Sequence, residues 1–230
     1  MTRELVLDTE TTGLDPNTGD RIVEIGAVEL INLMPTGRTY HQYINPQRDM
    51  PKEAFDVHGL SIEFLSDKPV FSAIAKDFAD FVGTDKMVIH NASFDMKFLN
   101  AELKWAGLQI LPMDQAVDTL EIARRKFPGA QNSLDALCRR FGIDNSMREK
   151  HGALLDSEIL AEVYLELLGG RQPDLVLSSQ PAKVVQNASV QTVGKAKARE
   201  TPLASLLSDA EKAAHSAFVD SLGDQPIWRK

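Results

Sequence analysis

Two acidic residues lie two positions apart in the stretch Val6–Gly13, which reads Val-Leu-Asp-Thr-Glu-Thr-Thr-Gly. Residues 3–7 are mostly apolar and predict the beginning of a strand. Because side chains alternate faces along a strand, we expect Asp8 and Glu10 on the same side, roughly 6.5–7 Å apart along the chain. Like charges this close repel each other unless a cation neutralises them. Gly13 would let the chain turn and approach a ligand closely. The stretch is a candidate metal site, although a solvated strand end would show the same pattern.

Three residues further along the chain are candidates to join these carboxylates. Asp95 follows a short apolar segment, and Asp156 lies in the first turns of a predicted long helix. Strand ends and the starts of following helices meet at one edge of an α/β sheet, which would bring Asp95 to the first strand. His151 comes five residues before Asp156, and Gly152 between them favours a loop. Taken singly, the aspartates also suit helix N-termini and the histidine suits a surface loop.

The segments that must position these residues alternate between strand and helix patterns. Strands are predicted at 3–7, 22–31, 38–44, 86–90 and 113–117, and helices at 70–82, 91–103, 133–141 and 154–168, with one more starting at 118. Turns at 15–20 and 34–37 make the first three strands an antiparallel meander, and residues 45–59 are expected to be irregular. The pattern predicts an α/β fold with a mixed five-stranded sheet and helices on its faces.

Two polar residues in this pattern have structural interpretations. Asn91 is predicted to cap the helix that follows it, and Asp118, with Glu121, fits the cap of the next helix. Cys138 lies in an apolar helical pattern and is expected to be a buried thiol in a reducing compartment.

Composition limits the function classes. The 230 residues, 43% of them hydrophobic, suffice for one domain with an appended tail. With 33 acidic and 25 basic residues the formal charge is −8, which argues against a broad basic surface for nucleic acid and leaves room for contact with a few phosphates only. No apolar run approaches the roughly 18 residues of a membrane span and the first residues lack the order of a signal peptide, so we expect a cytoplasmic protein without a membrane partner.

Taken together, the candidate residues form three motifs that resemble those of the DEDDh 3′→5′ exonucleases. The motifs are Asp-Thr-Glu-Thr-Thr-Gly at 8–13, Asn-Ala-Ser-Phe-Asp at 91–95 with Phe98, and His151 followed by Asp156. The resemblance covers roughly residues 4–170. The segments 132–138 and 151–156 are similar in particular to the epsilon-type proofreading exonucleases of bacterial DNA polymerase III. The implied fold is RNase H-like, and the implied activity is removal of mismatched 3′-terminal nucleotides, with the protein working in the bacterial cytoplasm at the replisome.

The resemblance also implies the roles of the five residues. Clustered oxygen ligands without thiolates suit hard cations, so two divalent ions, Mg²⁺ or Mn²⁺, are expected. Asp8, Glu10 and Asp156 would bind them directly, with Asp8 as the bridge, and Asp95 would assist. His151 would be the general base, because an imidazole can take a proton near neutral pH.

A second group of residues is expected to bind the substrate, a single-stranded 3′ end of DNA. The segment 53–59 resembles the family loop that holds the terminal nucleotide, and Glu53 and His58 are carried over from it, beside Asp8, Glu10 and Asp156. A turn closed by Gly59 would explain the same segment. Phe94 is expected in the core rather than against a base.

The last 59 residues differ in character from the exonuclease domain predicted at 1–171. Residues 172–200 are expected to form a flexible linker, which opens with a motif resembling those that bind the β sliding clamp through Gln172, Leu175 and Leu177. Residues 201–230 are expected to form a helical tail that starts at a capping box, Ser208 with Glu211. By the resemblance this tail binds the polymerase alpha subunit, with Leu206, Leu207, Phe218 and Trp228 as candidate contacts.

Two other functions fit parts of the pattern. A stand-alone DEDDh exonuclease that trims RNA or repair intermediates would not need the linker and tail. A catalytically inactive module that regulates polymerase or clamp assembly would not need the five active-site residues, all of which are present.

Overall fold

A computed structural model describes residues 2–146, 150–170 and 208–221. The chain divides into two units, Met1–Leu177 and Ser178–Lys230. The first unit holds five strands, two short 3-10 helices and seven α-helices among its described residues. In chain order they are β1 (Arg3–Thr11), η1 (Pro16–Thr18), β2 (Ile22–Ile31), β3 (Met34–Tyr43), α1 (Lys52–His58), α2 (Ile62–Leu65), α3 (Phe71–Val82), β4 (Lys86–Ile89), α4 (Ala92–Trp105), η2 (Met113–Gln115), β5 (Ala116–Asp118), α5 (Thr119–Lys126), α6 (Leu134–Phe141) and α7 (Ala153–Leu167).

The five strands form one mixed sheet in the order β3-β2-β1-β4-β5. β2 pairs antiparallel with β1 and β3, whereas β4 runs parallel to both β1 and β5. The predicted mixed five-stranded sheet is confirmed. β1 lies in the centre of the sheet and is paired along both of its edges.

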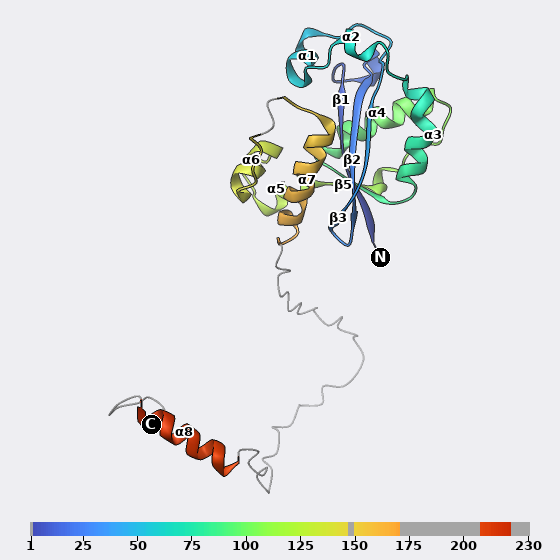
Figure 1. Cartoon of the computed structure of the whole chain (residues 1–230). Coiled ribbons are helices and arrows are strands. Elements are labelled where there is room, and N and C mark those ends of the chain that lie inside the picture. Colours follow the sequence, from blue (N-terminus) through green and yellow to red (C-terminus); the bar gives the residue numbers. More distant parts are fainter. Residues whose placement is uncertain (1, 147–149, 171–207, 222–230) are drawn as a thin grey trace, which may run out of the picture. The chain divides into compact units, whose positions relative to one another are not determined.

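Alternation along β1 divides the apolar residues between the two faces of the sheet. Leu5 and Leu7 pack in one core cluster with α3 and α4, while Val6 packs in the other with α5, α6 and α7. Figure 1 shows these two groups of helices on opposite faces. Cys138 is buried in the second cluster, as expected.

The turn predicted at 34–37 is wrong. The chain reverses at Asn32 and Leu33, whose φ angles of +50° and +67° suit the tight two-residue turn of a hairpin, and β3 already begins at Met34. Pro35 therefore lies inside a strand, opposite Leu30. The sheet accepts a residue without an N–H there because β3 is an edge strand.

Two further segments also differ from prediction. Residues 45–59, expected to be irregular, contain α1, which begins after Pro51 and ends at Gly59 in the left-handed conformation. The strand predicted at 113–117 is a 3-10 turn followed by the three-residue β5. Short elements like these are held by their surroundings and leave little periodicity in the sequence.

The second unit is described only at 208–221. There α8 (Asp209–Ser221) follows the predicted capping box: the Glu211 amide donates to Ser208 Oγ at 3.3 Å, and the Ser208 amide donates to Glu211 Oε2 at 2.8 Å. Phe218 is 62% exposed on this helix. In the described part of the chain, no helix combines the length and apolarity needed to cross a bilayer.

Candidate active site

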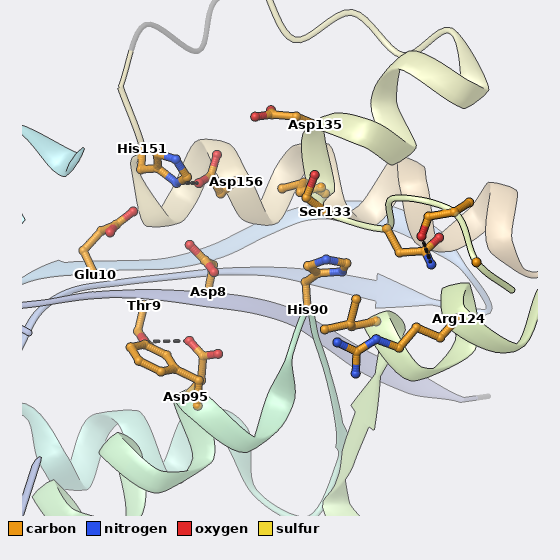
Figure 2. A pocket seen from close by; sticks show the side chains of 16 residues that line it. Asp8, Thr9, Glu10, His90, Asp95, Arg124, Ser133, Asp135, His151 and Asp156 are labelled. Carbon is orange, nitrogen blue, oxygen red and sulfur yellow. Dashed lines mark hydrogen bonds and ion pairs between the residues drawn. The ribbon is translucent and has the colours of Figure 1, made fainter. Parts of the chain in front are cut away.

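The central strand β1 places its two carboxylates on the α7 face of the sheet. In Figure 2, Asp8 and Glu10 point toward Asp156 and His151, whereas Thr9 between them points the other way, toward Asp95. The prediction that the two acids share a side is confirmed. The Glu10 side chain is buried.

Gly13 lies in a bend just past β1, as expected, and also leaves room for a neighbouring side chain. A Cβ added there would collide with the carboxylate of Asp20. The glycine therefore makes room for Asp20, which accepts from the Asp15 amide at 3.1 Å and pairs with Arg48.

Asp95 enters the site from the first turn of α4, on the opposite face of β1. Thr9 Oγ1 donates to Asp95 Oδ1 at 2.7 Å, and the carboxyl is almost completely buried. Burial raises the pKa of Asp95 to about 7, against the hydrogen bonds from Thr9 that lower it. A buried carboxyl in this state needs a nearby positive charge to stay ionised at neutral pH.

Asn91 stands at the predicted start of α4, but its side chain does not cap the helix. Its φ of +68° turns the chain sharply between β4 and α4, and its amide donates to Asp118 Oδ1 at 3.2 Å. Asp118 does cap α5, as predicted, by accepting from the amides of Leu120 and Glu121. Asn91 serves the turn through its backbone because asparagine tolerates the left-handed conformation.

The start of α7 brings Asp156 and His151 to β1 by close packing on β2. A Cβ at Gly26 would collide with the backbone of Ala153 and Leu154, so only glycine allows this approach. Ser157 Oγ lies 2.9 Å from the Gly26 carbonyl oxygen, and the Ala153 amide donates to Glu24 Oε2 at 3.2 Å. Gly26 is the partner of Asp8 in the strand register. The helix start is therefore held directly beside the β1 carboxylates.

His151 lies in the loop before α7, as predicted, with about half of its side chain exposed. Its amide donates to the Val57 carbonyl at the end of α1 at 3.3 Å. Its Nδ1 lies 3.3 Å from Asp156 Oδ2. This contact holds the ring beside the buried carboxylate while leaving it at the rim, where water and substrate can reach it.

The donor set fits a hard divalent cation. Single ligand atoms of Glu10, His151 and Asp156 lie within 4.8 Å of one another. Asp156 is 2% exposed and Glu10 7%, and burying such neighbouring negative charges is costly unless a cation joins them. Carboxylate oxygens suit Mg²⁺ or Mn²⁺ and no cysteine lines the cleft.

All five predicted catalytic residues line one cleft of about 730 Å³. The cleft is also lined by His90 and by further residues that the sequence did not single out for the site; these are Arg124, Asn132, Ser133 and Asp135. Figure 2 shows Arg124 beyond His90. The position of His90 directly after a buried strand was the only signal available for it. Phe94 both packs against the core and lines the cleft, so its expected core role is confirmed but incomplete.

Glu53 and His58 lie on α1 and are not among the residues that line this cleft. Glu53 is exposed, whereas His58 is buried. The Leu60 amide donates to His58 Nδ1 at 3.0 Å, which places the ring proton on Nε2. Burial lowers the pKa of His58 to about 4, so the ring is neutral at physiological pH. The contacts of Glu53 and His58 with a substrate stay a prediction.

The structure does not describe most of the contacts that we proposed beyond residue 170. Those outside the described residues are Gln172, Leu175, Leu177, Leu206, Leu207 and Trp228.

Comparison with known proteins now decides the family. The exonuclease family model RNase_T matches residues 5–164. DNA polymerase III subunit epsilon of Rickettsia conorii (strain ATCC VR-613 / Malish 7) is 49% identical over 223 residues, which are 96% of each chain. The chain belongs to the DNA polymerase III epsilon family of exonucleases. The epsilon subunit of Escherichia coli (strain K12) is 42% identical over 240 residues, covering 100% of this chain and 98% of the relative.

Solved structures show the same fold for the exonuclease domain. Exonuclease X in complex with 5′ overhanging duplex DNA has a TM-score of 0.55 at 26% identity, over 72% of this chain and 90% of that one. The nuclease domain of 3′hExo, a DEDDh family member bound to rAMP, has a TM-score of 0.63 at 20% identity, over 72% and 91%. The RNase H-like fold expected for an epsilon-family exonuclease is confirmed, and a protein of this family depends on divalent metal ions.

Proposed function

We propose that this chain is the proofreading exonuclease of a bacterial replicative DNA polymerase. It removes the 3′-terminal nucleotide of a single-stranded DNA end by hydrolysis of the last phosphodiester. The observation that carries the proposal is the convergence of Asp8, Glu10, Asp95, His151 and Asp156, from three separate segments of the chain, at one end of a single cleft.

The acidic residues of the cleft would hold two divalent cations, Mg²⁺ or Mn²⁺. Asp8, Glu10 and Asp156 would bind them directly, and Asp95 would assist from the α4 side. When bound, such ions activate the attacking water and stabilise the leaving 3′ oxygen. Thr9 contributes by orienting the Asp95 carboxyl through its hydrogen bond.

His151 acts as the general base. Its Nδ1 lies 3.3 Å from Asp156 Oδ2, which orients the ring, and the ring would take a proton from the attacking water. The new bond forms between the water oxygen and phosphorus, and the bond to the 3′ oxygen breaks. The terminal nucleotide leaves as a 5′-monophosphate and the shortened strand ends in a 3′-hydroxyl. The half-exposed loop position suits this role, since the base must exchange its proton with solvent in each cycle.

The residues after 170 would deliver this chemistry to the polymerase. The epsilon relatives match the chain nearly end to end, which supports a tail that binds the alpha subunit and a cytoplasmic place at the replisome. The segment 172–177 would contact the β sliding clamp, and Glu53 and His58 would contact the terminal nucleotide.

A nuclease assay on the full chain tests the proposal. We expect Mg²⁺-dependent release of 5′-mononucleotides from the 3′ end of single-stranded DNA, faster at mismatched than at matched primer ends, and none with EDTA. Asp8→Ala serves as the inactive control. Equal activity of Asp8→Ala and wild type would contradict the site. Faster digestion of RNA than of DNA would contradict the proofreading role and favour a stand-alone trimming enzyme.

Two binding measurements test the partners separately. Deletion of residues 201–230 should abolish co-purification with the polymerase alpha subunit while nuclease activity remains. A peptide of residues 172–177 should compete for the β sliding clamp, whereas the same peptide with alanine in place of Gln172 and Leu175 should not. Unchanged co-purification, or equal competition by both peptides, would contradict the corresponding partner.

A further inference from the structure

Arg124 stands at the far end of the cleft from His151 and Asp156. Figure 2 shows it beyond His90, on the side away from Glu10. Among the sixteen described residues that line the cleft, it is the only arginine or lysine. A lone cation at the end of an otherwise acidic cleft has a natural ligand in an anion that passes the carboxylates and continues beyond them.

The Arg124 guanidinium contributes no described interaction that stabilises the fold. It has no ion pair or hydrogen bond among the residues that the structure describes, and its side chain is exposed. The two next residues of α5 are engaged: Arg125 pairs with Glu121 at 3.8 Å, and Lys126 Nζ donates to the Leu167 carbonyl at 3.1 Å. α5 itself is anchored through buried Ala123. Arg124 is thus held in place by a packed helix while its charged group stays available.

Asn132, which precedes Ser133 in the chain, is a second polar residue that lines this cleft. Its Nδ2 donates to the carbonyl oxygens of Ala130 at 3.0 Å and Phe127 at 3.4 Å, which identifies the other amide atom as the oxygen. That oxygen is buried and accepts no hydrogen bond within the described structure, although the residue is only 8% exposed. A buried acceptor left without a donor is costly. A ligand with an N–H group at this position would satisfy it.

We infer that this end of the cleft binds the nucleotide that precedes the scissile bond, with Arg124 contacting its 5′ phosphate. The inference rests on the proposed exonuclease function. The terminal nucleotide of a 3′ end has no neighbour on its 3′ side, so any phosphate other than the scissile one belongs to the upstream strand. An arginine can hold such a phosphate with two parallel hydrogen bonds. Asn132 Oδ1 accepts an N–H of the same nucleotide's base.

Three small substrates separate this contact from the chemistry. The 5′-p-nitrophenyl ester of thymidine monophosphate has a scissile bond but no upstream nucleotide. TpT has an upstream nucleoside without a 5′ phosphate, and pTpT adds that phosphate. Wild-type protein should have a lower KM for pTpT than for TpT. Arg124→Ala should raise the KM for pTpT roughly 10- to 100-fold, to the level of TpT, with kcat within about twofold and the ester unaffected.

Matched variants complete the experiment. Arg125→Ala removes the same charge from the next position of α5, outside the cleft, and should leave all three substrates unchanged. Arg124→Lys should recover part of the preference for pTpT, because it keeps the charge but loses the paired hydrogen bonds. Thermal unfolding is measured for each variant. A midpoint temperature equal to that of the wild type shows that the variant is folded.

Several results would overturn the inference. These are a preference for pTpT that survives Arg124→Ala, an equal loss on the nitrophenyl ester, or an equal effect of Arg125→Ala. If wild-type protein hydrolyses none of the three substrates with Mg²⁺, the proposed function itself fails. If it hydrolyses them and Arg124→Ala behaves as wild type, only the subsite fails.

Discussion

The two halves of the catalytic end are built in different ways. Asp8 and Glu10 belong to β1, which is paired on both sides, so their common direction follows from the alternation of one strand. His151 lies in the loop before α7 and Asp156 in the first turn of α7, and the position of this helix start depends on packing against β2. The strand half is positioned by local geometry, and the helix half by contacts between segments more than 120 residues apart. Substitutions in the strand half should therefore change chemistry alone, whereas the helix half can also be damaged from a distance.

Loss of a carboxylate ligand should have the largest effect, equal in the two halves. Glu10→Ala and Asp156→Ala should each reduce Mg²⁺-dependent hydrolysis of 5′-labelled single-stranded DNA by more than the roughly 10²–10⁴-fold expected for a lost general base. The reason is that removing either one disrupts the site that holds the cations. Single-turnover rates with excess protein measure this. Near wild-type activity in either variant would mean that this half is not part of the metal site.

Loss of the base should be smaller and confined to the rate. His151→Ala should slow hydrolysis roughly 10²–10⁴-fold, while Mn²⁺ binding measured by calorimetry stays within a few-fold of wild type. A large loss of Mn²⁺ affinity would show instead that His151 is a metal ligand, which its closeness to Glu10 and Asp156 allows.

The dependence of the helix half on packing is tested at Gly26. Gly26→Ala places a methyl group against the backbone of Ala153 and Leu154, so we expect a loss of about 1–3 kcal/mol in unfolding free energy and a rate lowered up to about 10²-fold. Denaturant unfolding and the same nuclease assay measure both.

Gly152→Ala is the matched control for that variant. It makes the same change on the other side of the junction, where a Cβ meets nothing within 4 Å and the backbone is extended. Its unfolding free energy should stay within about 0.5 kcal/mol of wild type. Equal effects of the two variants would mean that contact at Gly26 does not position α7.

The smallest expected effect is on the pH dependence of the unfolding free energy and concerns His58. This residue follows Val57, whose carbonyl oxygen accepts a hydrogen bond from the His151 amide. Its pKa is about 4 in the folded protein and 6.5 ordinarily, so between these values the unfolded chain binds more protons. Stability from this group is complete above pH 6.5 and is lost as pH falls toward 4.

His58→Gln should remove part of this dependence. We expect the loss of unfolding free energy between pH 6.5 and 4.5 to shrink by on the order of 1–2 kcal/mol relative to wild type. Urea unfolding at several pH values measures it. An identical pH profile for the two proteins would contradict a buried neutral His58.

The strand half of the site was predictable from the sequence because its signals are local. β2 was predicted at its observed bounds, and Asp8 and Glu10 needed only the period of two. The close approach of α7 to Gly26 was not predictable, because it joins segments far apart in the chain and a glycine in a strand has many explanations. Arg124 was missed for a similar reason: a charged residue on the exposed side of a short helix looks like any solvated arginine.

The hairpin at Asn32 and Leu33 was missed for a different reason. A two-residue turn with positive φ normally carries glycine, and the nearby Met-Pro-Thr-Gly sequence offered a more conventional turn. The actual turn is imposed by the register of β2 and β3, in which Ile31 pairs with Met34.

The position of Pro35 also affects how molecules of this protein meet one another. The outer strands of the sheet are β3 and β5, and an open strand is a template for pairing with a second chain. β3 lacks a donor at Pro35 and is paired irregularly between Val28 and Leu30, while β5 has only three residues. The edge strand β3 is thus interrupted near Pro35, and the edge strand β5 is short. We expect these features of β3 and β5 to disfavour pairing between the sheet edges of two copies of this chain.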